Sequence, residues 1–99
     1  MLNRAPDGGY RLEAELTFAT VTGLRPLGLA ALAAAAPDAD VNFDLAAVRH
    51  ADSAGLALLV DWLAAARGRG QRLGFAGLSP ELRALARLSD VEDLLVPAR

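Results

Sequence analysis

One stretch of this chain, residues 41–60, most constrains the possible folds, because it joins a strand-like segment directly to a helix-like one. Residues 41–45 form a short apolar run that is typical of a buried strand. Further on, apolar residues recur at helical spacing, at Leu56, Leu59, Val60 and Leu63. Asp52 and Ser53 stand where this helix should begin, and either side chain can cap the free N–H groups of its first turn. The stretch therefore predicts a strand, a tight crossing and a helix whose positively polarised N-terminus presents a hydroxyl group.

The N-terminal part predicts a strand preceded by a loose segment. Residues 1–9 contain a proline and two glycines, so we expect a flexible lead-in there. Over residues 10–18 apolar and polar residues alternate, which predicts a half-solvated strand, either straight or bent into two near Ala14. Its apolar face would hold Tyr10, Leu12, Ala14, Leu16 and Phe18.

The remaining segments alternate between helix and strand. Over residues 21–36 we expect a helix that Thr20 or Thr22 caps and that is kinked at Pro26 or begins only there. The next helix should run from residue 53 to about residue 67, and a short strand should follow over residues 73–77. A serine, a proline and an acid at residues 79–81 then signal a further helix. A final turn over residues 90–95 should end at Pro97.

Strands that alternate with helices imply crossover connections and a partly parallel sheet. The first strand has no helix before it, which favours an antiparallel pair at the start of the chain. We therefore expect one α/β domain over residues 10–97, with a single-layer, mixed and mostly parallel sheet of four or five strands and helices mainly on one face.

The composition indicates a globular protein and argues against several functions. Of the 99 residues, 54% are hydrophobic and 22% are charged, and the net charge is −2, with the basic residues scattered. We therefore expect no nucleic-acid partner. The chain has no cysteine, and its acids match no known metal-binding loop, so we expect neither a metal nor a cofactor. Neither a signal peptide nor a membrane span is apparent, which predicts a cytoplasmic protein.

Catalysis receives little support from the sequence. His50 is the only histidine and lies close to Ser53 along the chain, with Asp44 and Asp52 as possible acids of a nucleophilic triad. However, the string around Ser53 does not match the Gly-x-Ser-x-Gly elbow of hydrolases. We therefore expect that this chain is not an enzyme.

Two residues of the second helix have both a structural and a functional interpretation. Ser53 either contributes only to helix capping or presents an accessible, phosphorylatable hydroxyl at a recognition surface. Trp62 lies with Leu58 on the side of the helix opposite the predicted core, so it either packs against a neighbouring helix or contacts a partner.

The motif around Ser53 resembles that of a STAS domain, the fold of bacterial anti-sigma factor antagonists. In that family a Ser or Thr in an Asp-Ser/Thr-x-Gly-Leu string begins the second helix, and residues 52–56 here match that string. The preceding strand and the later strand–helix pair stand in the same order, so the resemblance covers residues 12–95.

Two branches of the family are relevant. In anti-sigma factor antagonists a partner kinase, the anti-sigma factor, phosphorylates the serine and thereby blocks binding. In the MlaB branch the STAS protein binds the ATPase subunit of an ABC transporter that moves phospholipids and maintains outer-membrane lipid asymmetry. Residues 55–63 and 82–97 look more like the MlaB branch, and Ala54 replaces the residue type that often follows a phosphorylated serine.

The resemblance implies a partner-binding surface at the start of the second helix. We expect it to consist of Asp52, Ser53, Ala54, Gly55, Thr20, Val21 and Trp62. Ser53 would be the phospho-acceptor if one exists. Gly55 would let a partner backbone approach closely. The chain would associate with the cytoplasmic side of the inner membrane only through its partner.

Overall fold

The computed structural model describes residues 2–95, which form one four-stranded mixed sheet and four helices. The strands are β1 (Leu2–Arg4), β2 (Tyr10–Leu12), β3 (Asp40–Asp44) and β4 (Arg72–Ala76), and they lie in this order across the sheet. β1 pairs antiparallel with β2, whereas β2, β3 and β4 are parallel to one another. This sheet confirms the predicted fold class.

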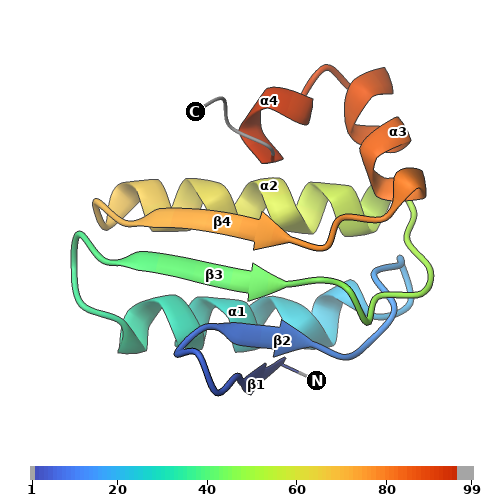
Figure 1. Ribbon diagram of the computed structural model, residues 1–99. Helices are drawn as coiled ribbons and strands as arrows, with labels where there is room; N and C mark the ends of the chain where they lie inside the picture. Colours follow the sequence, from blue (N-terminus) through green and yellow to red (C-terminus); the bar gives the residue numbers. More distant parts are fainter. Residues whose placement is uncertain (1, 96–99) are drawn as a thin grey trace.

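The helices lie mainly on one side of the sheet (Figure 1). They are α1 (Val21–Ala34), α2 (Ser53–Gly68), α3 (Pro80–Leu88) and α4 (Glu92–Leu95). α1 and α2 pack side by side against one face, while α3 and α4 lie beyond the β4 edge and contact α2. The expected end of the last turn at Pro97 lies outside the described residues.

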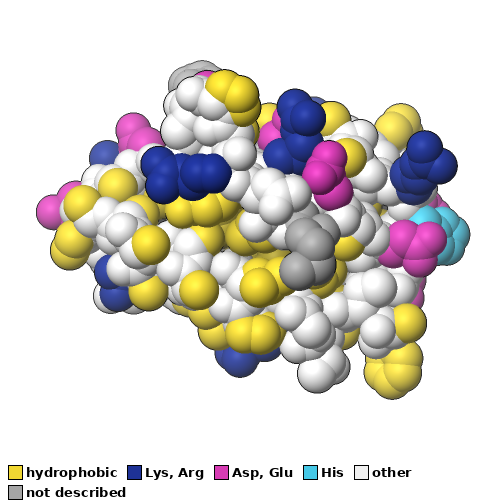
Figure 2. All heavy atoms as spheres, turned by 90° about the horizontal axis from the view of Figure 1, so that it is seen from below, with side chains coloured by type: hydrophobic (Ala, Val, Ile, Leu, Met, Phe, Trp, Pro, Cys, Tyr) yellow, Lys and Arg dark blue, Asp and Glu magenta, His cyan; other side chains and the backbone are white. Residues whose placement is uncertain are grey.

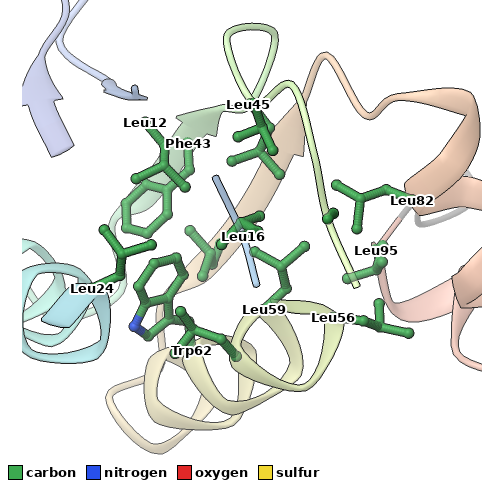
Figure 3. Close-up of a cluster of buried hydrophobic side chains, with 14 of the residues drawn as sticks. Leu12, Leu16, Leu24, Phe43, Leu45, Leu56, Leu59, Trp62, Leu82 and Leu95 are labelled. Atoms are coloured by element: carbon green, nitrogen blue, oxygen red, sulfur yellow. The ribbon is translucent and has the colours of Figure 1, made fainter. Parts of the chain in front are cut away.

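The core fills the space between the sheet and the two long helices. Its largest fully buried side chains come from every layer: Trp62, Phe43, Leu12, Leu16, Leu32, Leu45, Leu59, Leu82 and Leu95 (Figure 3). The Phe43 ring, in the central strand, lies edge-on to the rings of Tyr10, Phe75 and Trp62. Edge-to-face pairs of this kind add to the stabilisation that burial of the rings provides.

The N-terminal segment corrects two expectations. Residues 1–9 were expected to be a flexible lead-in, but Leu2–Arg4 form β1, because their backbone pairs with residues Tyr10–Leu12 of β2. The strand predicted over residues 10–18 is indeed broken in two: after β2, Leu16 forms a separate parallel bridge with Ala51. Phe18 does not face the core as expected, because the chain turns over residues 17–20 and the alternation ends.

The first helix runs through its proline. α1 begins at Val21, so the alternative start at Pro26 is wrong. Pro26 lies on the exposed side of the helix, where water can bond the carbonyl that proline leaves without an N–H partner. At the other end of α1 the buried Gln71 side chain donates from Nε2 to the carbonyl oxygens of Leu32 at 2.8 Å and Ala36 at 3.2 Å. Gln71 thus satisfies carbonyl groups that a helix C-terminus leaves free.

Trp62 is part of the core and not of a partner surface. Its side chain is 0% exposed, and its indole Nε1 donates to the carbonyl oxygen of Arg25 at 3.1 Å. The ring lies directly against Gly28 of α1, where a Cβ atom would come within 2.1 Å of it. The expected role of Trp62 in partner binding is therefore wrong: α2 is apolar on two sides because it packs against both the sheet and α1.

A pair of glycines in α1 tests this packing. Gly28→Ala places a methyl group against the Trp62 ring, so we expect it to lower the free energy of unfolding by about 1–3 kcal/mol. Gly23→Ala is the matched control, because a Cβ atom at Gly23 meets nothing within 4 Å. The control should raise stability by about 0.5–1 kcal/mol, since alanine favours a helix. Urea unfolding measures both; equal effects would contradict the close Gly28–Trp62 contact.

Candidate functional site

The candidate site is the N-terminus of α2, which Asp52 and not Ser53 caps. Oδ1 of Asp52 accepts from the backbone N–H groups of Ala54 at 2.9 Å and Gly55 at 3.1 Å. Asp52 has an extended backbone, as an N-cap residue should, and its side chain satisfies two of the helix's free donors. Ser53 is consequently the first residue of the helix, and its side chain is exposed.

The same carboxylate holds the loop that precedes α1. Oδ2 of Asp52 accepts from the backbone N–H of Phe18 at 3.0 Å. Around Leu16, the backbone N–H donates to the carbonyl oxygen of His50, and the carbonyl oxygen accepts from the N–H of Asp52. Segments that are far apart in the sequence therefore meet at one end of the molecule, where the loops after β2 and β3 lie together (Figure 1).

The close approach of the Leu16 backbone to α2 requires a glycine at position 55. A Cβ atom at Gly55 would lie 2.1 Å from the carbonyl oxygen of Leu16, which is closer than any real contact. The backbone that approaches Gly55 thus belongs to the chain itself, and Gly55 is buried. The expectation that Gly55 admits a partner backbone is wrong; the glycine instead allows the loop before α1 to sit on α2.

The hydrogen bonds lower the pKa of the Asp52 carboxyl. The bond from the Phe18 N–H contributes most, followed by that from Gly55, while partial burial opposes the shift. The Ala54 N–H and the nearby His50 add smaller effects in the same direction. Donors that bond the charged form favour ionisation, so Asp52 is a carboxylate at neutral pH.

Ser53 and Ala57, one turn apart on the exposed side of α2, stand between two shallow grooves. A groove of about 390 Å³ between α1 and α2 is lined by Val21, Thr22, Arg25, Ala54, Ala57, Leu58 and Asp61. A second groove of about 270 Å³ separates α2 from the segment that joins α3 and α4, and it is lined by Ser53, Leu56, Ala57, Val60, Ser89 and Val91. Both linings are largely apolar.

Val21 and Thr20, the two residues expected to extend the surface from the start of the first helix, have different surroundings. Val21 lines the groove beside Ala54, as a shared surface requires. The Thr20 hydroxyl, by contrast, is used within its own loop, where it donates to the carbonyl oxygen of Glu15 at 2.6 Å and accepts from the N–H of Thr17 at 3.0 Å. Thr20 therefore shapes the loop, and its side chain does not cap α1.

Nothing at this site has the geometry of a catalytic triad. Within residues 2–95 no hydrogen bond joins the His50 ring to the Ser53 hydroxyl, and Asp52 is occupied by backbone donors. In the same part of the chain, no group of three or more His, Asp or Glu side chains is arranged to hold a metal ion. The site offers a hydroxyl and apolar surface, which suits recognition of another protein.

Sequence reasoning missed several residues of this surface. Phe18 is 82% exposed beside the Asp52 cap, although the alternation had placed it in the core. Arg25 and Asp61 form an ion pair at 2.5 Å across the α1–α2 groove. Ala57 could have been found, because it follows Ser53 by one helical turn; Arg25 carries no comparable signal, since only tertiary packing brings it to Asp61.

Seen from the side of β1 and α1, the molecule exposes hydrophobic side chains across the middle of this face (Figure 2). Basic and acidic side chains lie mostly around the edges of this face, where several of them neighbour a side chain of opposite charge. No helix formed by residues 2–95 combines the length and hydrophobicity needed to cross a bilayer.

The chain belongs to the class of STAS domains, whose family model it matches. Its mixed four-stranded sheet, with helices mainly on one face, is the fold of this class. The fold is similar to that of a solved STAS domain protein from Planctomyces limnophilus, described as an anti-sigma-factor antagonist. The TM-score is 0.76 at 16% sequence identity, covering 96% of this chain and 85% of the other.

Within that class, the chain belongs to the family whose model is described as "Mlab, STAS domain". This model matches residues 7–97, which is nearly the whole chain. No curated protein matches the sequence. The predicted resemblance to STAS domains, and to the MlaB branch among them, is therefore confirmed.

The lowered pKa of Asp52 makes its contribution to stability depend on pH. The stabilisation is fully present above the pKa that this carboxyl has in the unfolded chain, and it is lost as the pH falls through the lower folded-state pKa. We expect Asp52→Asn to be less stable than the wild type at pH 7 and the gap to close at strongly acidic pH. Urea unfolding from pH 7 to pH 2 measures this; a gap that stays constant with pH would contradict it.

Proposed function

We propose that this chain is a non-catalytic STAS subunit that binds the ATPase subunit of a phospholipid-transporting ABC complex and supports its activity. The observation that carries the proposal is the accessible surface around Ser53, in a chain of the MlaB family. The transporter would maintain lipid asymmetry of the outer membrane. In this proposal the chain lies on the cytoplasmic side of the inner membrane and is held there only by its partner.

The chemistry of the surface supports a protein partner. Ser53 is exposed, and the grooves on either side of it are lined largely by apolar side chains. Arg25 and Asp61 pair with each other, and backbone N–H groups meet the charge of Asp52. Apolar surface with a few polar groups is what a specific protein interface requires. The ATPase subunit, and not this chain, would bind the nucleotide.

A second candidate function is an anti-sigma factor antagonist that is switched by phosphorylation of Ser53. It is favoured by the exposure of the Ser53 side chain, whose hydroxyl makes no hydrogen bond to residues 2–95. A phosphate would add almost two negative charges in the middle of the contact surface, where repulsion and desolvation oppose binding. The partner would then be a kinase-like anti-sigma factor.

Ser53→Asp tests the recognition surface without removing the helix cap. Asp52 remains as the cap, and an acid in the first turn of α2 is favourable to the helix, so we expect the melting temperature to be unchanged or slightly higher. Binding of the ATPase subunit should weaken by roughly tenfold or more. Ser53→Ala is the matched control, which removes the hydroxyl but adds no charge and should bind nearly as well as wild type.

An affinity pull-down from the native membrane fraction distinguishes the two functions. Recovery of an ABC ATPase by wild type and its loss with Ser53→Asp would support the transporter subunit. Recovery of a soluble kinase-like protein, together with a phosphate mass shift on Ser53, would support the sigma-factor switch. If Ser53→Asp loses stability and binding in parallel, Ser53 has only a structural role.

A further inference from the structure

Phe18 stands out because it is a large aromatic side chain in a well-held loop and yet is 82% exposed. Its backbone N–H donates to Oδ2 of Asp52 at 3.0 Å, so it lies beside the start of α2. The loop continues in a turn, in which the N–H groups of Thr20 and Val21 donate to the carbonyl oxygen of Thr17. The loop is therefore fixed at both ends while the ring remains in water.

We propose that Phe18 is the aromatic anchor of the partner-binding surface and that Asp52 is the residue that positions it. The inference rests on the proposed function, because the partner it commits to is the ABC ATPase subunit. That subunit would receive the ring in an apolar cleft. Aromatic side chains dominate many interfaces because they bury a large area at a small cost in conformational entropy.

On the side of the α1–α2 groove, the surface next to Phe18 matches an apolar cleft. Val21 and Ala54 continue the surface toward the α1–α2 groove and carry no charge. Arg25 and Asp61, at the far end of that groove, neutralise each other. The charge of Asp52 is met by three backbone N–H groups. A partner that approaches Phe18 from this groove therefore meets apolar surface and paired charges, while the exposed Glu15 and His50 lie in the segments bonded to the loop.

Asp52 can position Phe18 because the two carboxylate oxygens of Asp52 accept from different groups. Oδ1 caps α2 through Ala54 and Gly55, whereas Oδ2 holds the N–H of Phe18. In Asp52→Asn, the side-chain oxygen can still cap the helix, but the NH2 group that replaces Oδ2 cannot accept from Phe18. Asp52→Ser likewise keeps a good cap and has no second acceptor. Both variants therefore remove the acceptor of the Phe18 N–H while α2 stays capped.

The first arm of the test uses the isolated chain and amide hydrogen exchange. In Asp52→Asn and Asp52→Ser, the Phe18 amide should exchange roughly tenfold faster than in wild type. The amides of Ala54 and Gly55 should stay protected, because the cap remains. Unchanged exchange at Phe18, or an equal loss of protection at all three amides, would overturn the positioning role of Asp52.

The second arm measures binding to the purified ATPase subunit of the Mla-type complex from the same organism, by calorimetry. Phe18→Ala should weaken binding roughly tenfold or more, and Asp52→Asn roughly fivefold. Because Asp52 acts through Phe18, the double variant should bind no more weakly than Phe18→Ala alone. Additive losses in the double variant would overturn the proposed coupling.

Leu88→Ala is a matched control, because Leu88 is the other large hydrophobic side chain of comparable exposure among residues 2–95, at 85%. It should bind as wild type does; a loss equal to that of Phe18→Ala would indicate unspecific apolar association and overturn the inference. If wild type binds, Ser53→Asp does not, and Phe18→Ala binds like wild type, only the inference about Phe18 fails. If wild type does not bind the subunit at all, the proposed function fails and this inference fails with it.

Discussion

The close approach of the Leu16 backbone to Gly55 is the constraint on which the end of the molecule that carries the candidate site depends. With any side chain at position 55, the carbonyl oxygen of Leu16 would collide with its Cβ atom. Because the glycine is present, Leu16 can bridge to Ala51 and accept from the N–H of Asp52. The loop before α1 is thereby held against the start of α2, within reach of the Asp52 carboxylate.

A second close contact fixes the two long helices. Gly28 of α1 leaves space for the ring of Trp62 from α2, and the indole N–H finds the carbonyl oxygen of Arg25. The ring also reaches Phe43 in the central strand, so a single side chain connects both helices and the sheet (Figure 3). This contact sets the spacing between α1 and α2, and hence the groove that opens next to Ser53.

Much of the fold could be predicted from local patterns, because the responsible interactions are local. The helical spacing after Leu56 and the Ser79 cap of α3 gave elements close to those observed. The predictions that failed concern segments whose structure depends on contacts between residues far apart in the sequence. β1 forms through pairing with β2, and Phe18 does not face the core because the chain turns after Leu16.

The sequence by itself determined the class of fold and indicated where the candidate site lies, since alternating strands and helices and the Asp-Ser string are readable along the chain. Tertiary structure alone decided the role of each site residue. It made Asp52 the cap, left Ser53 exposed, and buried Gly55 and Trp62. The physical reason is that exposure depends on which distant segment packs on a residue, and Leu16 and α1 cover Gly55 and Trp62 but not Ser53.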